Sequence, residues 1–177
     1  IDPAGLGGQA EIRFSDYRDV SAAGFDAISS IGLTEHIGRD NYPSYFGFLY
    51  GKLRPEGRML NHTITRPHDQ WVTHFRKSFI NRYVFPDGEL SGPSQVMTAM
   101  NSAGFEIRHE ENLREHYALT LKHWCENLED HWDEAVAEAG LGTARVWRLY
   151  MAASRLGFDI NMIQLHQMLG VKLGPGG

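Results

Sequence analysis

The chain has 177 residues, of which 42% are hydrophobic and 22% are charged, and its formal net charge is −5. This composition suits one globular domain with a substantial core and excludes the disordered class. An acidic chain without a basic stripe gives no support to a nucleic-acid partner. No apolar run approaches the about 18–20 residues that cross a bilayer.

Cellular location is indicated by the cysteine content and by small basic clusters. Cys125 is the only cysteine, which excludes an internal disulfide framework and favours a reducing, cytoplasmic compartment. Arg76-Lys77 and the pair Arg54 and Arg58 could each touch anionic lipid at about 1 kcal/mol per charge, although solvated surface charge is the simpler interpretation. The sequence does not begin with Met, and we expect it to be part of a longer chain.

The first 65 residues predict strand, strand, helix, strand in chain order. The predicted elements are strands at 11–14 and 25–31, the second of them buried, a helix at 39–53 and a strand at 58–64. The helix is predicted by apolar residues at three- and four-residue steps, and Arg-Pro-Glu-Gly at 54–57 is a stop signal. This alternation predicts an α/β fold with a mostly parallel sheet.

The second half of the chain predicts mainly helices. After a long loop at 66–92 the predicted elements are helices at 94–103, 113–139 and 143–157 and strands at 105–109 and 161–171. Loops of that length are usually functional or mobile. No repeat and no internal boundary appears, so we expect residues 1–177 to belong to one domain.

Two polar pairs follow predicted strands, where ligands of open α/β sheets bind. Asp16 and Tyr17 follow 11–14; a carboxylate there can accept from an exocyclic amine and an aromatic ring can stack on a purine. Glu35 and His36 follow 25–31, where reactive groups of α/β enzymes lie. A turn Asp and a Glu near a helix start are the ordinary alternatives.

His62 lies on the next predicted strand, 58–64. A lone strand histidine is more often a hydrogen-bonded core residue than a catalyst. Because Glu35 and His62 end neighbouring strands, they could face one cavity, which favours a site.

The other histidines and the aromatic residues carry weaker signals. His116 and His123 are seven residues apart, about 10.5 Å along a helix, whereas zinc ligands lie about 2.0–2.1 Å from the metal. With His109 they therefore predict no metal site. The aromatic stripe suits helix packing and a lipid tunnel equally, and comprises Tyr117, Trp124, Trp132, Trp147, Tyr150 and Phe158.

Taken together, the segments resemble the cyclopropane-fatty-acid synthases and the mycolic-acid cyclopropane synthases. The resemblance covers nearly the whole chain in order. Its most specific segments are Glu-His-Ile-Gly at 35–38, His-Thr-Ile at 62–64, Phe-Pro-Asp-Gly at 85–88 and Tyr-Ala-Leu-Thr-Leu at 117–121. Within the family the sequence around 32–35 and 60–62 is most similar to the branch linked to methyl-branched fatty acids.

The resemblance implies a class I, Rossmann-like AdoMet-dependent methyltransferase fold. Its sheet is mostly parallel with an antiparallel last strand. Residues 1–177 would form the C-terminal part of a single methyltransferase domain. The N-terminal strands and the glycine-rich AdoMet loop would lie upstream, so this chain alone is expected to be inactive, and its uncovered sheet edges favour a homo-oligomer.

The resemblance also implies an activity and a bicarbonate site. The methyl group of S-adenosyl-L-methionine would be transferred to the double bond of an unsaturated fatty acyl chain, on a phospholipid or another carrier. The resulting carbocation would lose a proton to a bound bicarbonate, giving a cyclopropane ring or a methylene or methyl branch. The residues implied for bicarbonate are Glu35, His62, Tyr117 and the backbone at Ile64.

The residues implied for AdoMet lie earlier in the chain. Asp16 and Tyr17 match the adenine end, and Ile31 and His36 match the methionine end. Two other functions stay open: a class I methyltransferase acting on another small acceptor, and a non-catalytic fragment that binds a lipid or a partner.

Overall fold

The computed structural model describes residues 5–69 and 78–176. They form a four-stranded sheet in the order β1-β2-β4-β3. The strands are β1 (Phe25–Ile31), β2 (Leu53–Thr65), β3 (Phe105–Asn112) and β4 (Gln164–Lys172). β1 and β2 are parallel, whereas β4 is antiparallel to both β2 and β3. The predicted α/β class with an antiparallel last strand is confirmed.

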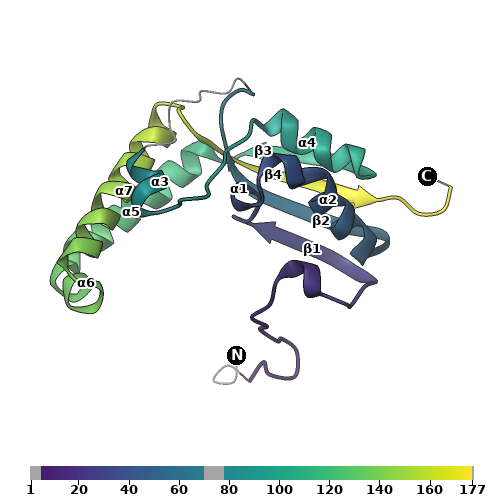
Figure 1. The fold of residues 1–177 in the computed structure, drawn as a ribbon, viewed down its shortest axis with the longest axis horizontal. Coiled ribbons are helices and arrows are strands. Elements are labelled where there is room, and N and C mark those ends of the chain that lie inside the picture. The colour runs from purple at the N-terminus through teal and green to yellow at the C-terminus, as the bar shows by residue number, and fades with distance from the viewer. Residues whose placement is uncertain (1–4, 70–77, 177) are drawn as a thin grey trace.

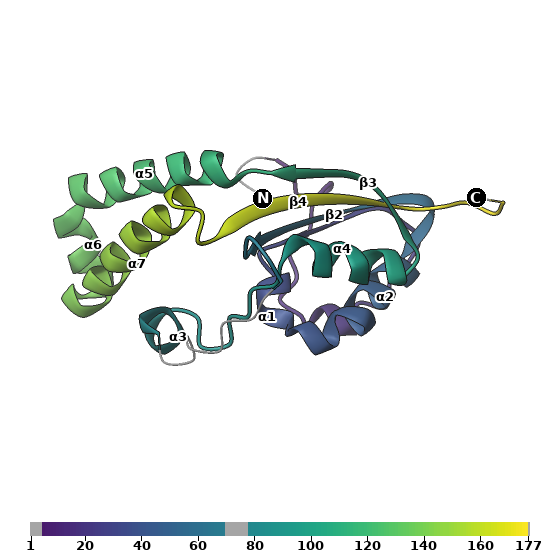
Figure 2. The same ribbon diagram turned by 90° about the horizontal axis from the view of Figure 1, so that it is seen from above.

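The helices form a layer on one face of the sheet and a separate lobe. They are η2 (Tyr17–Asp19), α1 (Thr34–Ile37), η3 (Arg39–Asn41), α2 (Tyr42–Lys52), α3 (Phe79–Tyr83), α4 (Pro93–Ser102), α5 (Arg114–Asp130), α6 (Trp132–Ala139) and α7 (Leu141–Asp159). Figure 2 shows α1, α2 and α4 on one side of the sheet. In Figure 1, α5, α6 and α7 extend from one end of it. Of the described helices, none is long and apolar enough to cross a bilayer.

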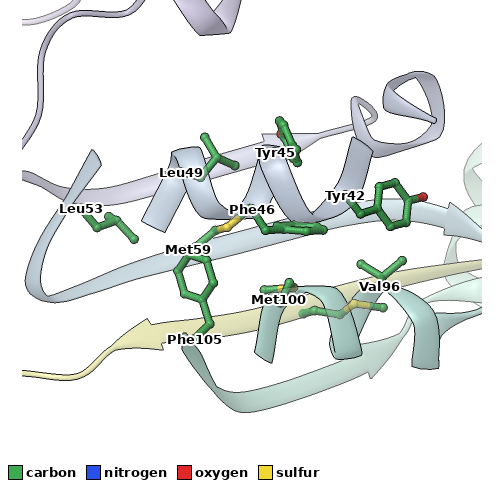
Figure 3. Close-up of a cluster of buried hydrophobic side chains, with 10 residues drawn as sticks. Tyr42, Tyr45, Phe46, Leu49, Leu53, Met59, Val96, Met100 and Phe105 are labelled. Carbon is green, nitrogen blue, oxygen red and sulfur yellow. The ribbon is translucent and has the colours of Figure 1, made fainter. Parts of the chain in front are cut away.

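The main core lies between the sheet and the helices α2 and α4 (Figure 3). Apolar residues of α2 recur at helical spacing and therefore share the face that meets the sheet. Phe46 of α2, Met59 of β2 and Met100 of α4 have no exposed area. This layer holds β2 and β4 against α2 and α4.

A second, smaller core joins the helical lobe to the end of β2 and β4. Its buried members are Ala118, Leu121, Phe158 and Leu165. Ile64, near the end of β2, packs against them, as does Tyr117. The lobe is thereby attached where β2 ends.

The N-terminal expectations are partly wrong. Residues 11–14 form no strand, because a strand needs a hydrogen-bonded neighbour and the described chain offers them none; Ile12 and Phe14 are exposed. The strand at 25–31 is correct in extent, but its expected burial is wrong. Its alternate residues face the side of the sheet that no described helix covers.

Several boundaries differ from the expected ones. The helix expected at 113–139 is two helices, α5 and α6, because His131 takes a non-helical conformation. Helix α2 ends at Lys52 as the stop signal predicts, but β2 begins at once and its pairing with β1 is irregular near Glu56, which has a φ of 64°. Strand β4 begins at Gln164 because Asn161, at a φ of 60°, turns the chain.

Two phenylalanines provide a matched test of the main core. Phe46→Ala removes a fully buried ring and is expected to lower the free energy of unfolding by about 3–5 kcal/mol. Phe14→Ala removes the same atoms from an exposed position and should change it by less than about 0.5 kcal/mol. Urea unfolding measures both, and equal losses would contradict this assignment of the core.

Candidate functional site

The candidate site is built around Glu35 on the one-turn helix α1. Gly32 and Gly38 flank this turn with φ values of 64° and 80°, a region that glycine enters at little cost. These two reversals bring Glu35 back under the sheet at the end of β2. Only 7% of Glu35 is exposed.

Beyond the end of β1, the Glu35 carboxylate accepts a hydrogen bond from a backbone N–H of β2. The last β1–β2 contact is the Gly32 N–H donating to the His62 carbonyl at 2.9 Å. One step further along β2, the Ile64 N–H donates to Glu35 Oε1 at 2.7 Å. Glu35 Oε2 is buried and has no hydrogen-bond partner among the described residues. An unsatisfied buried acceptor costs about 1–3 kcal/mol, so the site suits a ligand that donates a hydrogen bond.

Helix α1 is held in place from two sides. The Thr34 hydroxyl donates to Asn61 Oδ1 at 2.6 Å, which fixes α1 to the buried face of β2. On the other side the Glu89 N–H donates to the Glu35 carbonyl at 2.8 Å. Arg39 in turn forms an ion pair with Glu89 at 3.0 Å. The loop before α4 therefore supports the site.

His62 lies opposite Ile31 in the parallel pair, as the neighbouring-strand prediction requires. Its ring is half-buried, and its Nδ1 lies 3.0 Å from Gln167 Nε2 on β4. Burial lowers the pKa of His62, while the charge of Glu35 raises it. The neutral ring is therefore favoured although a carboxylate is near.

Two tyrosines of the helical lobe complete the group. Burial raises the pKa of Tyr117, and Tyr150 and Glu35 raise it further. Burial also raises the pKa of Tyr150, with a smaller contribution from Glu35. The Tyr117 ring meets Phe158 edge-on at 5.0 Å, so the aromatic stripe does pack between helices. The charge of Glu35 thus acts on the pKa values of His62, Tyr117 and Tyr150, as it also does on those of the core tyrosines Tyr42 and Tyr45.

The predicted adenine residues lie at the start of η2, with Asp16 as its N-cap and Tyr17 as its first residue; η2 lies beside β1 in Figure 1. Asp16 follows no strand, so the expectation that it lies at the end of one is wrong. Its carboxylate caps η2 and binds Arg18, which lowers the pKa of Asp16 to about 2. The Tyr17 ring packs edge-on against Tyr45 at 5.1 Å, and Tyr45 shares a 2.6 Å hydrogen bond with Ser30 on β1.

The predicted methionine-end residues lie near the end of β1. Ile31 is 67% exposed, and His36 is exposed on α1. The His36 ring lies 5.3 Å from Phe85, which contacts Tyr150 at 5.7 Å. No hydrogen bond, ion pair or ring contact joins Asp16 or Tyr17 to Ile31 or His36 among the described residues, so the structure does not bring these four residues into one closed pocket.

The other features singled out in the sequence give weaker support to a functional site. Within residues 5–69 and 78–176 no cluster of three His, Cys, Asp or Glu could hold a metal ion. Cys125 is half-buried, and burial raises the pKa of its thiol. Arg54 forms an ion pair with Asp26, and Arg76 and Lys77 lie outside the described residues.

The α/β fold matches that of solved methyltransferase structures. A solved structure of the mycolic acid cyclopropane synthase CmaA1, complexed with SAH and CTAB, is similar with a TM-score of 0.83. The match covers 96% of this chain and 65% of that one at 24% identity, and at that identity it supports the fold alone. The family model for mycolic acid cyclopropane synthetase matches residues 1–168, and the chain belongs to that family.

Curated relatives agree with this assignment and with the predicted resemblance. A probable fatty acid methyltransferase of Mycobacterium tuberculosis is 58% identical over all of this chain and 41% of its own length. The cyclopropane-fatty-acyl-phospholipid synthase of Escherichia coli is 33% identical over 89% of this chain and 40% of its own length. The chain therefore spans about two fifths of these relatives.

The electrostatic coupling in the site can be tested by titration. Glu35→Gln removes the charge that raises the pKa of His62, so this pKa should fall further below its ordinary value. Glu110→Gln is the matched control, because Glu110 acts on His166 and should lower only the pKa of His166. NMR titration of both rings measures this. An unchanged His62 pKa in Glu35→Gln would refute the coupling.

Proposed function

We propose that the complete protein containing these residues transfers a methyl group from AdoMet to the double bond of an unsaturated fatty acyl chain. The observation that carries the proposal is Glu35 Oε2, a buried acceptor without a hydrogen-bond partner among the described residues, in a group with His62 and Tyr117. The names of the relatives, a fatty acid methyltransferase and a cyclopropane synthase, support the acyl substrate.

The residues near the end of β2 fit a small anion such as bicarbonate. Glu35 Oε2 could accept a hydrogen bond from its hydroxyl group, while Tyr117 and a neutral His62 could donate hydrogen bonds to its other oxygens. The N–H of Ile64 is already bound to Glu35 Oε1, so Ile64 would contribute by orienting that carboxylate. Tyr150 gives the same group a further hydroxyl.

The residues beside β1 fit part of AdoMet. Asp16 and Tyr17 present a carboxylate and a ring, with Ile31 and His36 near the strand's carboxyl end, where open α/β sheets bind ligands. Asp16 would exchange part of its contact with Arg18 for the ligand. These groups could hold one side of the cofactor, and the remaining length of the relatives would supply the other.

The chemistry assigned to this chain's residues is positioning and charge stabilisation. When bound, AdoMet supplies an electrophilic methyl group and bicarbonate supplies a base. An alkene has no proton to lose before it attacks, so no activated Ser or Cys nucleophile is needed. The rings of Tyr117, Tyr150 and Phe158 favour a passing cation and exclude water. Glu35 adds negative charge where a carbocation would develop.

We also propose where the protein works. The protein would work in the cytoplasm, where peripheral contact with a membrane would bring an acyl chain to the helical lobe of α5, α6 and α7. In the 177-residue chain taken alone, β1 is an edge strand of the described sheet, and a second copy could associate there.

Substitutions in the group provide the direct test. In the complete protein, Glu35→Gln and Tyr117→Phe are each expected to lower kcat by about 10²-fold or more, the cost of losing a preorganised polar group. Glu115→Gln and Tyr83→Phe, at exposed positions, should retain activity. Mass spectrometry of fatty acids methylated from deuterated AdoMet measures the rate. Full activity of Glu35→Gln would contradict the proposal.

Bicarbonate dependence gives a second readout. Removing dissolved carbon dioxide should slow the unchanged protein, and added bicarbonate should restore its rate. In Glu35→Gln a higher bicarbonate concentration should be needed, because the acceptor for its hydroxyl is weakened. A rate independent of bicarbonate would refute this part of the proposal.

The 177-residue chain by itself should transfer no methyl group. It offers AdoMet only the side of the site beside β1, and it spans 41% of a relative that is 58% identical. Calorimetric titration with AdoMet, paired with the same methylation assay, measures this. A methylated lipid product from the 177-residue chain would contradict the expectation.

A further inference from the structure

Gln167 on β4 lies directly opposite His62 on β2. The antiparallel register pairs the two residues, and Gln167 Nε2 is 3.0 Å from His62 Nδ1. Both side chains are half-buried. Neither the sequence motifs nor the proposed function uses Gln167.

The direction of this hydrogen bond determines the state of the imidazole ring. An amide –NH₂ group can only donate, so His62 Nδ1 must accept and carry no proton. A neutral imidazole then carries its single proton on Nε2. That nitrogen is the one left free to meet a ligand.

We propose that Gln167 is a positioning residue that holds His62 as the Nε2–H tautomer, so that His62 donates a hydrogen bond to the bound anion instead of removing a proton. The inference rests on the proposed function, in which Glu35, His62 and Tyr117 surround a small anion. It gives each residue of that group a hydrogen-bonding role: Glu35 accepts a hydrogen bond from the ligand, while His62 and Tyr117 donate hydrogen bonds to it.

The surroundings of His62 agree with this role. Burial lowers the pKa of His62 and outweighs the opposing effect of Glu35, so the ring is neutral near pH 7, where a tautomer has to be selected. A ring without a fixed partner on Nδ1 would exchange between two tautomers, of which only one donates from Nε2. Removal of the partners that orient metal-binding histidines changes affinity or activity by about 10–100-fold, and we expect an effect of the same order at this metal-free histidine.

The neighbours of Gln167 point the other way and make it separable from the core. His166 and Met168 are buried on the opposite face of the strand, where His166 Nδ1 is 2.7 Å from the Thr65 hydroxyl. Since side chains alternate along a strand, a substitution at Gln167 leaves those contacts in place. Its effect can therefore be attributed to His62.

The test compares Gln167→Glu and Gln167→Leu with Gln164→Leu in the complete protein. Gln164 is a glutamine of the same strand whose partner is Asn161, and it serves as the control. ¹⁵N NMR reports which His62 nitrogen carries the proton. Steady-state kinetics against pH report the consequence for methyl transfer.

We expect the unchanged protein to show the Nε2–H signature. Gln167→Glu should reverse it, because a carboxylate accepts from Nδ1–H, and should raise the pKa of His62 and move the lower limb of the pH profile upward. Gln167→Leu should show a mixture of tautomers. Both should lower kcat by about 10-fold or more, while Gln164→Leu keeps the signature and the rate.

An Nδ1–H signature in the unchanged protein, or an unaltered tautomer in Gln167→Glu, would overturn the proposal. A reversed tautomer with an unaltered rate would overturn the role of Gln167 in the reaction. If the unchanged protein methylates no acyl chain, the proposed function fails, and the NMR signature still decides whether Gln167 selects the tautomer.

Discussion

The hydrogen bond from the Ile64 N–H to the Glu35 carboxylate is the constraint on which the candidate site depends. It places a charge just beyond the end of β1, where the parallel ladder stops. The same residue, Ile64, packs its side chain into the small core that anchors the helical lobe. One residue therefore links the carboxylate to the small core against which Tyr117 also packs. The charge of Glu35 raises the pKa values of His62, Tyr117 and Tyr150 against or in addition to the effect of burial.

Strand β4 links the two faces of the sheet through the alternation of its side chains. Met168 faces the main core, and His166 on the same face bridges Thr65 and Glu110. Between them, Gln167 faces the opposite side and meets His62. The last strand is thus both the centre of the packing and part of the site. The register of β4 is fixed because a shift of one residue would exchange its two faces and expose the buried side chains.

One face of the sheet and the outer edge of β1 are uncovered in the described residues. A parallel strand pair is usually buried on both faces, since its connections place helices there. Ile31 is nevertheless 67% exposed, and Phe25 is 37% exposed. Relatives that are more than twice as long offer the means to cover such a surface. The residues that we propose for AdoMet lie along this same edge.

The sequence by itself determined the order of most elements and the family, because helical spacing and short motifs are local properties. The resemblance to the family, and not a local pattern, implied the antiparallel last strand. It also brought Glu35 and His62 together, through the rule that neighbouring strands end at one edge. It did not determine the strand expected at 11–14, the burial of β1 or the break at His131, since these depend on which neighbours are present. Gln167 could be found only in the tertiary structure, because strand register joins residues that are 105 positions apart in the chain.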